Sequence, residues 1–135
     1  LAFQLLIYPV LDGTFSTDSQ ASHTGAGIVQ ADMEVYYRCY SGGADRANPL
    51  LSPLLVDSTV GLPPAAVITA GFDCLRDEGR LYVDRLRDGG VEAELHHYPD
   101  AAHGFLSVPG LSSQARPALD AAAAALCSAL SGASA

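Results

Sequence analysis

Three short apolar segments alternate with longer segments of helical periodicity, and this alternation limits the folds open to the chain. Residues 3–8 and 65–70 are almost wholly apolar runs that end at Pro9 and Gly71. Runs of this length without polar alternation are typical of strands buried on both faces of a parallel sheet. A third run, residues 91–98, completes the predicted sheet.

The third run differs because its residues alternate in character. Val91, Ala93, Leu95 and His97 alternate with Glu92, Glu94, His96 and Tyr98. A period of two predicts a strand with one face in the core and the other in water. We therefore expect residues 91–98 at an edge of the sheet.

Helices are predicted at residues 31–40, 75–88 and 112–130, and glycine pairs follow the first two. The predicted buried faces are Met33, Tyr36, Tyr37 and Tyr40 in the first helix, Leu75, Tyr82, Val83 and Leu86 in the second, and Leu119, Ala122, Leu126 and Leu130 in the third. Residues 12–30 lack a period and predict a loop. Two prolines within residues 48–55 exclude a helix or a central strand, so an irregular packed connector is expected there.

The resulting order of strands and helices predicts an α/β fold. A parallel sheet would lie between two helical layers, as a three-layer α/β/α arrangement with right-handed crossovers. Three strands make a poor independent sheet, because the first would leave an unpaired apolar edge. Since the chain begins at Leu1, directly before a strand, we expect residues 1–135 to be the carboxyl-terminal part of a larger single domain.

Charge and cysteine content exclude several classes of partner. The chain carries 15 acidic and seven basic residues, a net charge of −8, which argues against binding to nucleic acid. No apolar run reaches the roughly 18 residues that a membrane span needs. The three cysteines show no CxxC spacing, so neither a disulfide framework nor a zinc site is predicted, and a cytoplasmic location is expected.

Two loops that follow predicted strands carry the candidate catalytic residues. Asp73 follows the second strand and His103 follows the third. Because the carboxyl ends of parallel strands meet at one edge of the sheet, the two side chains are expected to lie close together. A carboxylate that accepts a hydrogen bond from one imidazole nitrogen leaves the other nitrogen free to act as a base. Asp73 before His103 is also the order of acid and base in an α/β-hydrolase triad.

Other polar residues in these segments have structural interpretations. Asp73 could simply cap the following helix. Asp77 and Glu78 lie near the start of that helix, where carboxylates complement its dipole and can pair with a neighbouring arginine. Cys74 is predicted to be a small buried side chain. His96 and His97 point to opposite faces of a strand, so a joint metal site is not expected, and His23 is predicted to be an exposed loop residue.

Several motifs together resemble a known family. DCLRDEG at residues 73–79 and HGF at 103–105, with LIYP at 6–9, SPL at 52–54 and LPPA at 62–65, resemble the carboxyl-terminal half of hormone-sensitive-lipase-like esterases of the α/β-hydrolase fold. The resemblance covers nearly the whole chain. It implies that Asp73 is the triad acid and His103 the general base, that no metal or organic cofactor is needed, and that the substrates are carboxylic esters with small or medium acyl groups. Cys74 stands where many members have proline. The resemblance also implies that Tyr36, Tyr37 and Tyr40 could line the acyl pocket instead of packing in the core. It further implies a homodimer through residues 91–98, which the charges of Glu92 and Glu94 would partly disfavour.

The motifs that would supply the nucleophile and the oxyanion hole do not occur in the sequence. The chain has neither a G-x-S-x-G nucleophile elbow nor an H-G-G-G oxyanion motif. The leading hypothesis is a serine carboxylic-ester hydrolase whose acid and base lie in this chain and whose nucleophile lies outside it, so the chain alone should be inactive. A non-catalytic remnant or interaction module is the alternative, and a nucleotide-binding domain is disfavoured because no G-x-G-x-x-G loop is present.

Overall fold

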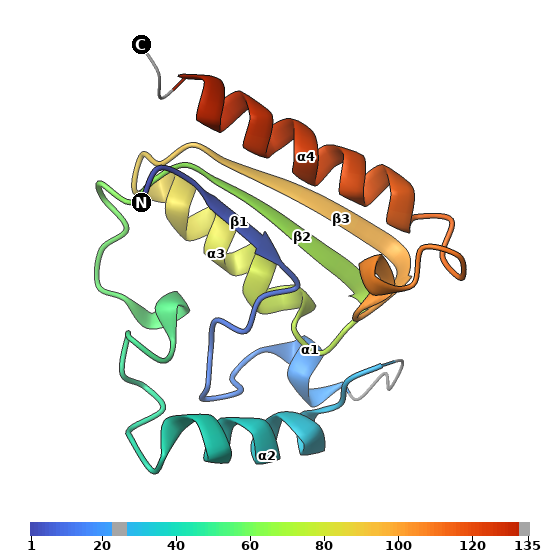
Figure 1. The fold of residues 1–135 in the computed structure, drawn as a ribbon. Helices are drawn as coiled ribbons and strands as arrows, with labels where there is room; N and C mark the ends of the chain where they lie inside the picture. The colour runs from blue at the N-terminus through green and yellow to red at the C-terminus, as the bar shows by residue number, and fades with distance from the viewer. Residues whose placement is uncertain (23–26, 133–135) are drawn as a thin grey trace.

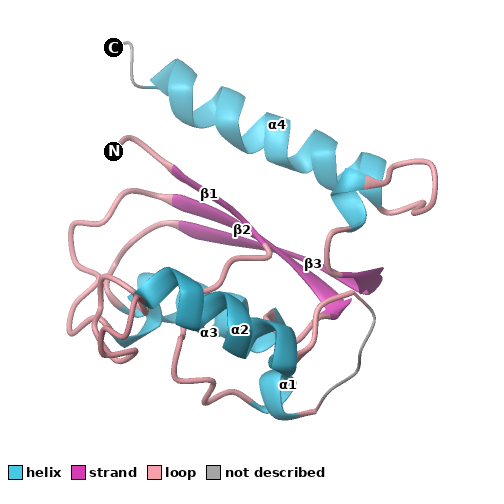
Figure 2. Ribbon diagram, turned by 60° about the horizontal axis from the view of Figure 1, so that its bottom comes forward, coloured by secondary structure: helices cyan, strands magenta, loops and turns pink. Residues whose placement is uncertain are grey.

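The computed structural model describes residues 1–22 and 27–132 and contains one parallel sheet. The sheet comprises β1 (Gln4–Ile7), β2 (Ala65–Phe72) and β3 (Ala93–Ala102), in the order β1-β2-β3. Helix α3 (Arg76–Asp88) covers one face and α4 (Ala115–Gly132) covers the other, as Figure 1 and Figure 2 show. The predicted three-layer α/β/α arrangement is confirmed.

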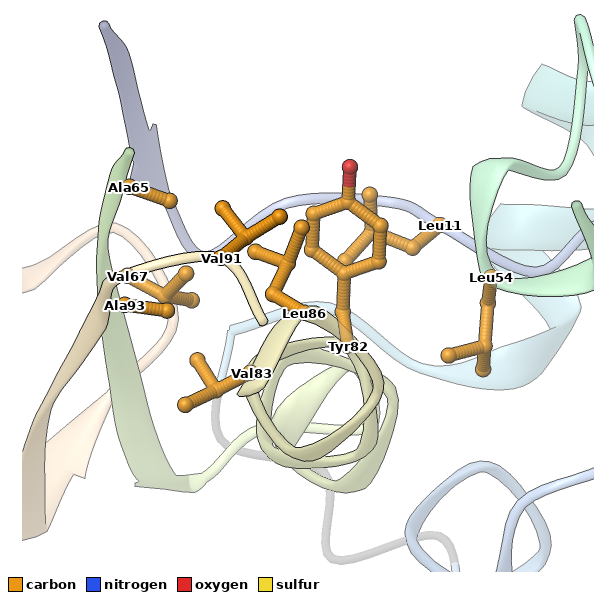
Figure 3. Close-up of a cluster of buried hydrophobic side chains, with 9 residues drawn as sticks. All are labelled: Leu11, Leu54, Ala65, Val67, Tyr82, Val83, Leu86, Val91 and Ala93. Carbon is orange, nitrogen blue, oxygen red and sulfur yellow. The ribbon is translucent and has the colours of Figure 1, made fainter. Parts of the chain in front are cut away.

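The central strand β2 is buried on both faces, as its apolar sequence predicts. Ala65 and Val67 belong to the cluster on the α3 side of the sheet, whereas Ile68 and Ala70 belong to the cluster on the α4 side. Figure 3 shows the first cluster, to which α3 contributes Tyr82, Val83 and Leu86 of its predicted face. All four residues predicted for that face, Leu75, Tyr82, Val83 and Leu86, are buried.

The buried face of α4 differs from the prediction. Its buried residues are Ala115, Ala118 and Ala122, whereas the leucines of the predicted stripe, Leu119, Leu126 and Leu130, are exposed. Small side chains allow the helix to approach the sheet closely, so volume rather than hydrophobicity determines which face is buried. Only Ala122 belongs to both the predicted and the observed face.

Strand β3 extends beyond its predicted end at residue 98, and β2 extends through Gly71. A Cβ on Gly71 would lie 1.9 Å from the Pro99 carbonyl oxygen, so glycine is required where β2 passes Pro99. Pro99 is tolerated because β3 is an edge strand of the described sheet. Tyr98 contradicts the prediction of a fully wet face, because it packs against the cluster beneath α4. Glu92 and Glu94 on that face are exposed, as predicted.

The long segment between β1 and β2 contains more helix than predicted. Helix α2 (Gln30–Ser41) agrees with the prediction and ends at Gly42, whose φ of 58° favours glycine. The predicted loop contains a short helix, α1 (Asp18–Ala21). Its N-cap residue Thr17 forms a capping box with Gln20. The predicted connector contains one turn of 3-10 helix, η1 (Pro53–Leu55).

Candidate active site

Asp73 lies immediately after β2 in a loop that buries it almost completely. Its side chain is 1% exposed, and Oδ1 accepts a hydrogen bond of 2.9 Å from the backbone N–H of Leu75 at the start of α3. Asp73 therefore stabilises the turn before α3 but does not cap the helix, because the N-cap residue is Leu75. Its second carboxylate oxygen remains for another partner.

That partner is His103, in the loop after β3. Nδ1 of His103 lies 2.9 Å from Oδ2 of Asp73, although 30 residues separate them in sequence. With the carboxylate ionised, the contact requires the proton to be on Nδ1, which leaves a lone pair on Nε2. Among the described residues no hydrogen-bond partner of Nε2 is found. The structure thus brings together the two residues that strand order predicts to meet.

The loop that carries Asp73 is held in place by Ser19, which precedes it by more than fifty residues. The hydroxyl of Ser19 donates to the Cys74 carbonyl at 2.8 Å and accepts from the backbone N–H of Asp77 at 3.1 Å. Asp77 in turn accepts from the Ser19 N–H at 2.9 Å and pairs with Arg76 at 2.8 Å. The structural role predicted for Asp77, including the arginine pairing, is confirmed.

Glu78 lies in the first turn of α3, as predicted, and has a further structural role. Its side chain is fully buried, and Oε2 accepts hydrogen bonds from the backbone N–H groups of Leu11 and Asp12 at 2.7 and 2.6 Å. Burial raises the pKa of Glu78 to about 8; the two N–H groups oppose this rise, and the nearby Asp12 and Asp73 carboxylates add to it. Glu78 therefore fixes the chain after β1 to the helix that follows Asp73.

Cys74 is buried beside Asp73, in a cluster with Met33 and Tyr37 of α2. Burial, reinforced by the charges of Asp73 and Glu78, raises the pKa of its thiol to about 11. A neutral thiol is a poor nucleophile. The prediction of a small buried side chain at Cys74 is confirmed.

An open cavity of about 560 Å³ lies next to His103. Its lining is mainly apolar and includes Tyr8 after β1 and the side chains of Met33, Tyr36 and Tyr40 from α2. The prediction that the tyrosines of α2 all pack into the core is wrong in part. Tyr37 is buried, whereas Tyr36 and Tyr40 are 58% and 72% exposed.

A larger cleft of about 900 Å³ lies between α3 and the end of β3, and its lining includes Arg80 and His97 but neither Asp73 nor His103. Half-buried His97 contacts Thr69, whereas His96 pairs with Glu94 and is partly buried rather than fully solvated. No cluster of metal-binding side chains occurs in residues 1–22 and 27–132. His23 lies outside the described residues.

Three contributors to this site are not evident from the sequence. Ser19 and Glu78 act through long-range hydrogen bonds. Gly27, with φ of 109°, passes so close to His103 that a Cβ there would lie 3.1 Å from the His103 carbonyl oxygen. Of the three, only Glu78 could have been anticipated from the sequence, because an acid within the buried stripe of α3 needs a hydrogen-bond partner.

Comparison with protein-family models matches residues 1–107 to the family described as the alpha/beta hydrolase fold. The chain belongs to the α/β-hydrolase family. The resemblance to hormone-sensitive-lipase-like esterases is also confirmed, since the relatives of this α/β-hydrolase chain are named esterases and carboxylesterases.

Two curated relatives and one solved structure illustrate the similarity. The α/β-hydrolase chain is 39% identical over 108 residues to the carboxylic ester hydrolase LipN of Mycobacterium tuberculosis, covering 78% of this chain and 29% of LipN. It is 31% identical over 114 residues to ethyl acetate hydrolase of Pseudomonas putida, covering 83% and 36% of the two chains. Esterase LipW from Mycobacterium marinum aligns with a TM-score of 0.87 at 30% identity, over 95% of this chain and 40% of LipW.

The α/β-hydrolase chain therefore spans 29–36% of the length of these two curated relatives. None of the helices in the described ranges is long and apolar enough to cross a membrane.

Proposed function

We propose that this chain supplies the acid and the base of a serine carboxylic-ester hydrolase. The observation that carries the proposal is the contact of 2.9 Å between Nδ1 of His103 and Oδ2 of the buried Asp73. Residues 1–135 would then be the carboxyl-terminal part of one catalytic domain, and the nucleophilic serine and oxyanion hole would come from outside them. Relatives named carboxylic ester hydrolase and ethyl acetate hydrolase support the reaction class.

In the proposed reaction, Nε2 of His103 removes the proton from the serine hydroxyl as the serine attacks the ester carbonyl. His103 then donates that proton to the leaving alcohol. In the second half, His103 activates the water that hydrolyses the acyl-enzyme. Asp73 stays ionised throughout and stabilises the imidazolium that forms in each step.

The cavity beside His103 supports an ester with an apolar portion as the substrate. Its lining residues Met33, Tyr36 and Tyr40 present hydrocarbon and aromatic surface next to the imidazole. Burial of apolar substrate groups against such side chains is the usual source of affinity in small-molecule sites. Esters with small or medium acyl groups remain the proposed substrate class.

The reaction is tested with p-nitrophenyl acetate. The full-length protein is expected to release p-nitrophenol, and an active-site serine reagent such as a fluorophosphonate should block the release. The isolated chain of 135 residues is expected to show no turnover above buffer, because it has no serine elbow. Absence of turnover by the full-length protein would favour the non-catalytic alternative. Robust turnover by a folded isolated chain would show that the nucleophile lies within it.

We also propose a homodimer through β3 and a cytoplasmic location. The outer edge of β3 has no neighbour among the described strands, and its backbone groups could pair with the same strand of a second copy. The three cysteines are free, as expected in a reducing compartment. Light scattering of the full-length protein should give twice the monomer mass. Ala93→Pro removes one backbone donor from β3 and should lower the measured mass. A monomeric wild type would contradict the dimer.

A further inference from the structure

Tyr8 adopts a backbone conformation that is unusual for a bulky residue. It follows β1 directly, and its φ of 36° lies in the left-handed region. Its backbone N–H still donates to the Ile68 carbonyl at 2.8 Å, so the strained residue is held at the end of the sheet. Such outliers cost free energy and persist where the surrounding structure fixes them, often beside functional groups.

The Tyr8 side chain bridges His103 and the turn that follows it. Its ring centroid lies 4.7 Å from that of His103, with the planes inclined by 52°. The ring also lies 5.9 Å from that of Phe105 in the turn η2 (Phe105–Ser107). Burial raises the pKa of the Tyr8 hydroxyl, and the adjacent Leu106 backbone and Ser107 side chain partly offset this rise.

His103 needs a second constraint besides Asp73. One hydrogen bond at Nδ1 leaves the imidazole free to tilt about the Nδ1···Oδ2 direction, and that tilt moves Nε2. The Tyr8 ring is the aromatic group packed beside this imidazole among the described residues. Offset and tilted aromatic contacts have preferred geometry, so they can restrict such a tilt.

We propose that Tyr8 is a positioning residue for His103, whose ring holds the imidazole so that Nε2 faces the cavity that both residues line. The proposal rests on the proposed function, because it gives Tyr8 a role in orienting the base of that triad. The ring of Tyr8 contacts His103, whereas its hydroxyl is near Leu106 and Ser107 of η2.

Tyr98 provides a matched control. Its ring packs against Phe105 at a centroid distance of 5.3 Å, so it belongs to the same cluster as Tyr8. The ring contacts of the described residues do not join Tyr98 to His103. Loss of the Tyr98 ring therefore disturbs the packing of η2 without removing a contact to the imidazole.

The experiment measures kcat and KM of the full-length protein for p-nitrophenyl acetate. Tyr8→Leu is expected to lower kcat by roughly 10- to 100-fold with KM within about threefold of wild type, since small misplacements of a catalytic group carry costs of this order. Tyr8→Phe keeps the ring and should retain kcat within about threefold. Tyr98→Leu should also retain it. If Tyr8→Leu does not fold, Tyr8→Asn replaces it, because asparagine tolerates positive φ.

Three outcomes would overturn the proposal. A raised KM with unchanged kcat would make Tyr8 only a wall of the cavity, and equal losses in Tyr8→Leu and Tyr98→Leu would make it only a packing residue. Unchanged kcat and KM in Tyr8→Leu would exclude any role of Tyr8 in the reaction. Wild-type activity that persists in His103→Ala would instead reject the proposed triad, so failure of the two proposals can be distinguished.

Discussion

Replacement of Asp73 by asparagine is expected to lower turnover of the full-length protein by about 10⁴-fold, the scale seen when a triad acid loses control of the histidine tautomer. The structure gives the reason. The Leu75 N–H requires an oxygen at Oδ1, so the amide nitrogen of the new asparagine would face His103. The proton on the imidazole would then move to Nε2, which could no longer act as a base.

Asp77→Asn is the matched control for this prediction. Asp77 lies four residues after Asp73 but contacts Arg76 and Ser19 rather than His103. Its substitution should change kcat by less than about tenfold, and p-nitrophenyl acetate turnover by both variants provides the comparison. The assignment of the acid would be contradicted if kcat fell by about tenfold or less in Asp73→Asn. It would also be contradicted if kcat fell by more than about tenfold in Asp77→Asn.

Replacement of Glu78 by alanine is expected to destabilise the protein by roughly 2–6 kcal/mol, because each buried unsatisfied donor costs about 1–3 kcal/mol. The two donors are the backbone N–H groups of Leu11 and Asp12, which have only this carboxylate as a described partner. Urea denaturation of wild type and variant measures the difference. Glu94→Ala, at a side chain that is 62% exposed, should have no measurable effect. A loss below about 1 kcal/mol in Glu78→Ala would contradict the prediction.

Glu78→Gln separates the charge from the hydrogen bonds. The ordinary pKa of this carboxyl is 4.5, and burial raises it to about 8 in the folded protein. The folded state then binds a proton more tightly than the unfolded state, so this group's stabilising contribution is complete below about pH 4.5 and is lost by about pH 8. The free energy of unfolding of wild type relative to Glu78→Gln should fall across that interval, by at most about 1.4 kcal/mol per pH unit. A rise in this difference across the interval would mean that folding lowers the pKa of Glu78, which would contradict the prediction.

The sheet and α3 were predictable because local pattern and burial agree there. The apolar run of β2 and the stripe of α3 both reach the core, and the strand-end rule brings Asp73 close to His103. Helix α4 shows where pattern fails. Its alanines, rather than its leucines, face the sheet, because small side chains allow the helix to pack closely against the sheet.

The surroundings of the candidate site were less predictable. Tyr8, Ser19 and Glu78 act through contacts to residues that are distant in sequence, and no periodicity encodes such pairs. The strained φ of Tyr8 is likewise a product of tertiary structure, because tyrosine has no local preference for the left-handed region. The sequence indicated the proposed acid and base, but the residues that contact them became visible only in the fold.

Under the proposed function, the hydrogen bonds of Ser19 would make catalytic competence depend on a small part of the molecule. Ser19 is buried in the short helix α1, yet it joins the loop that carries Asp73 across 55 residues of sequence. Such segments can open by local unfolding while the central sheet stays intact. An opened segment would release Asp73 from its place without melting the sheet, so inactivation under mild stress would be reversible and would precede the loss of secondary structure.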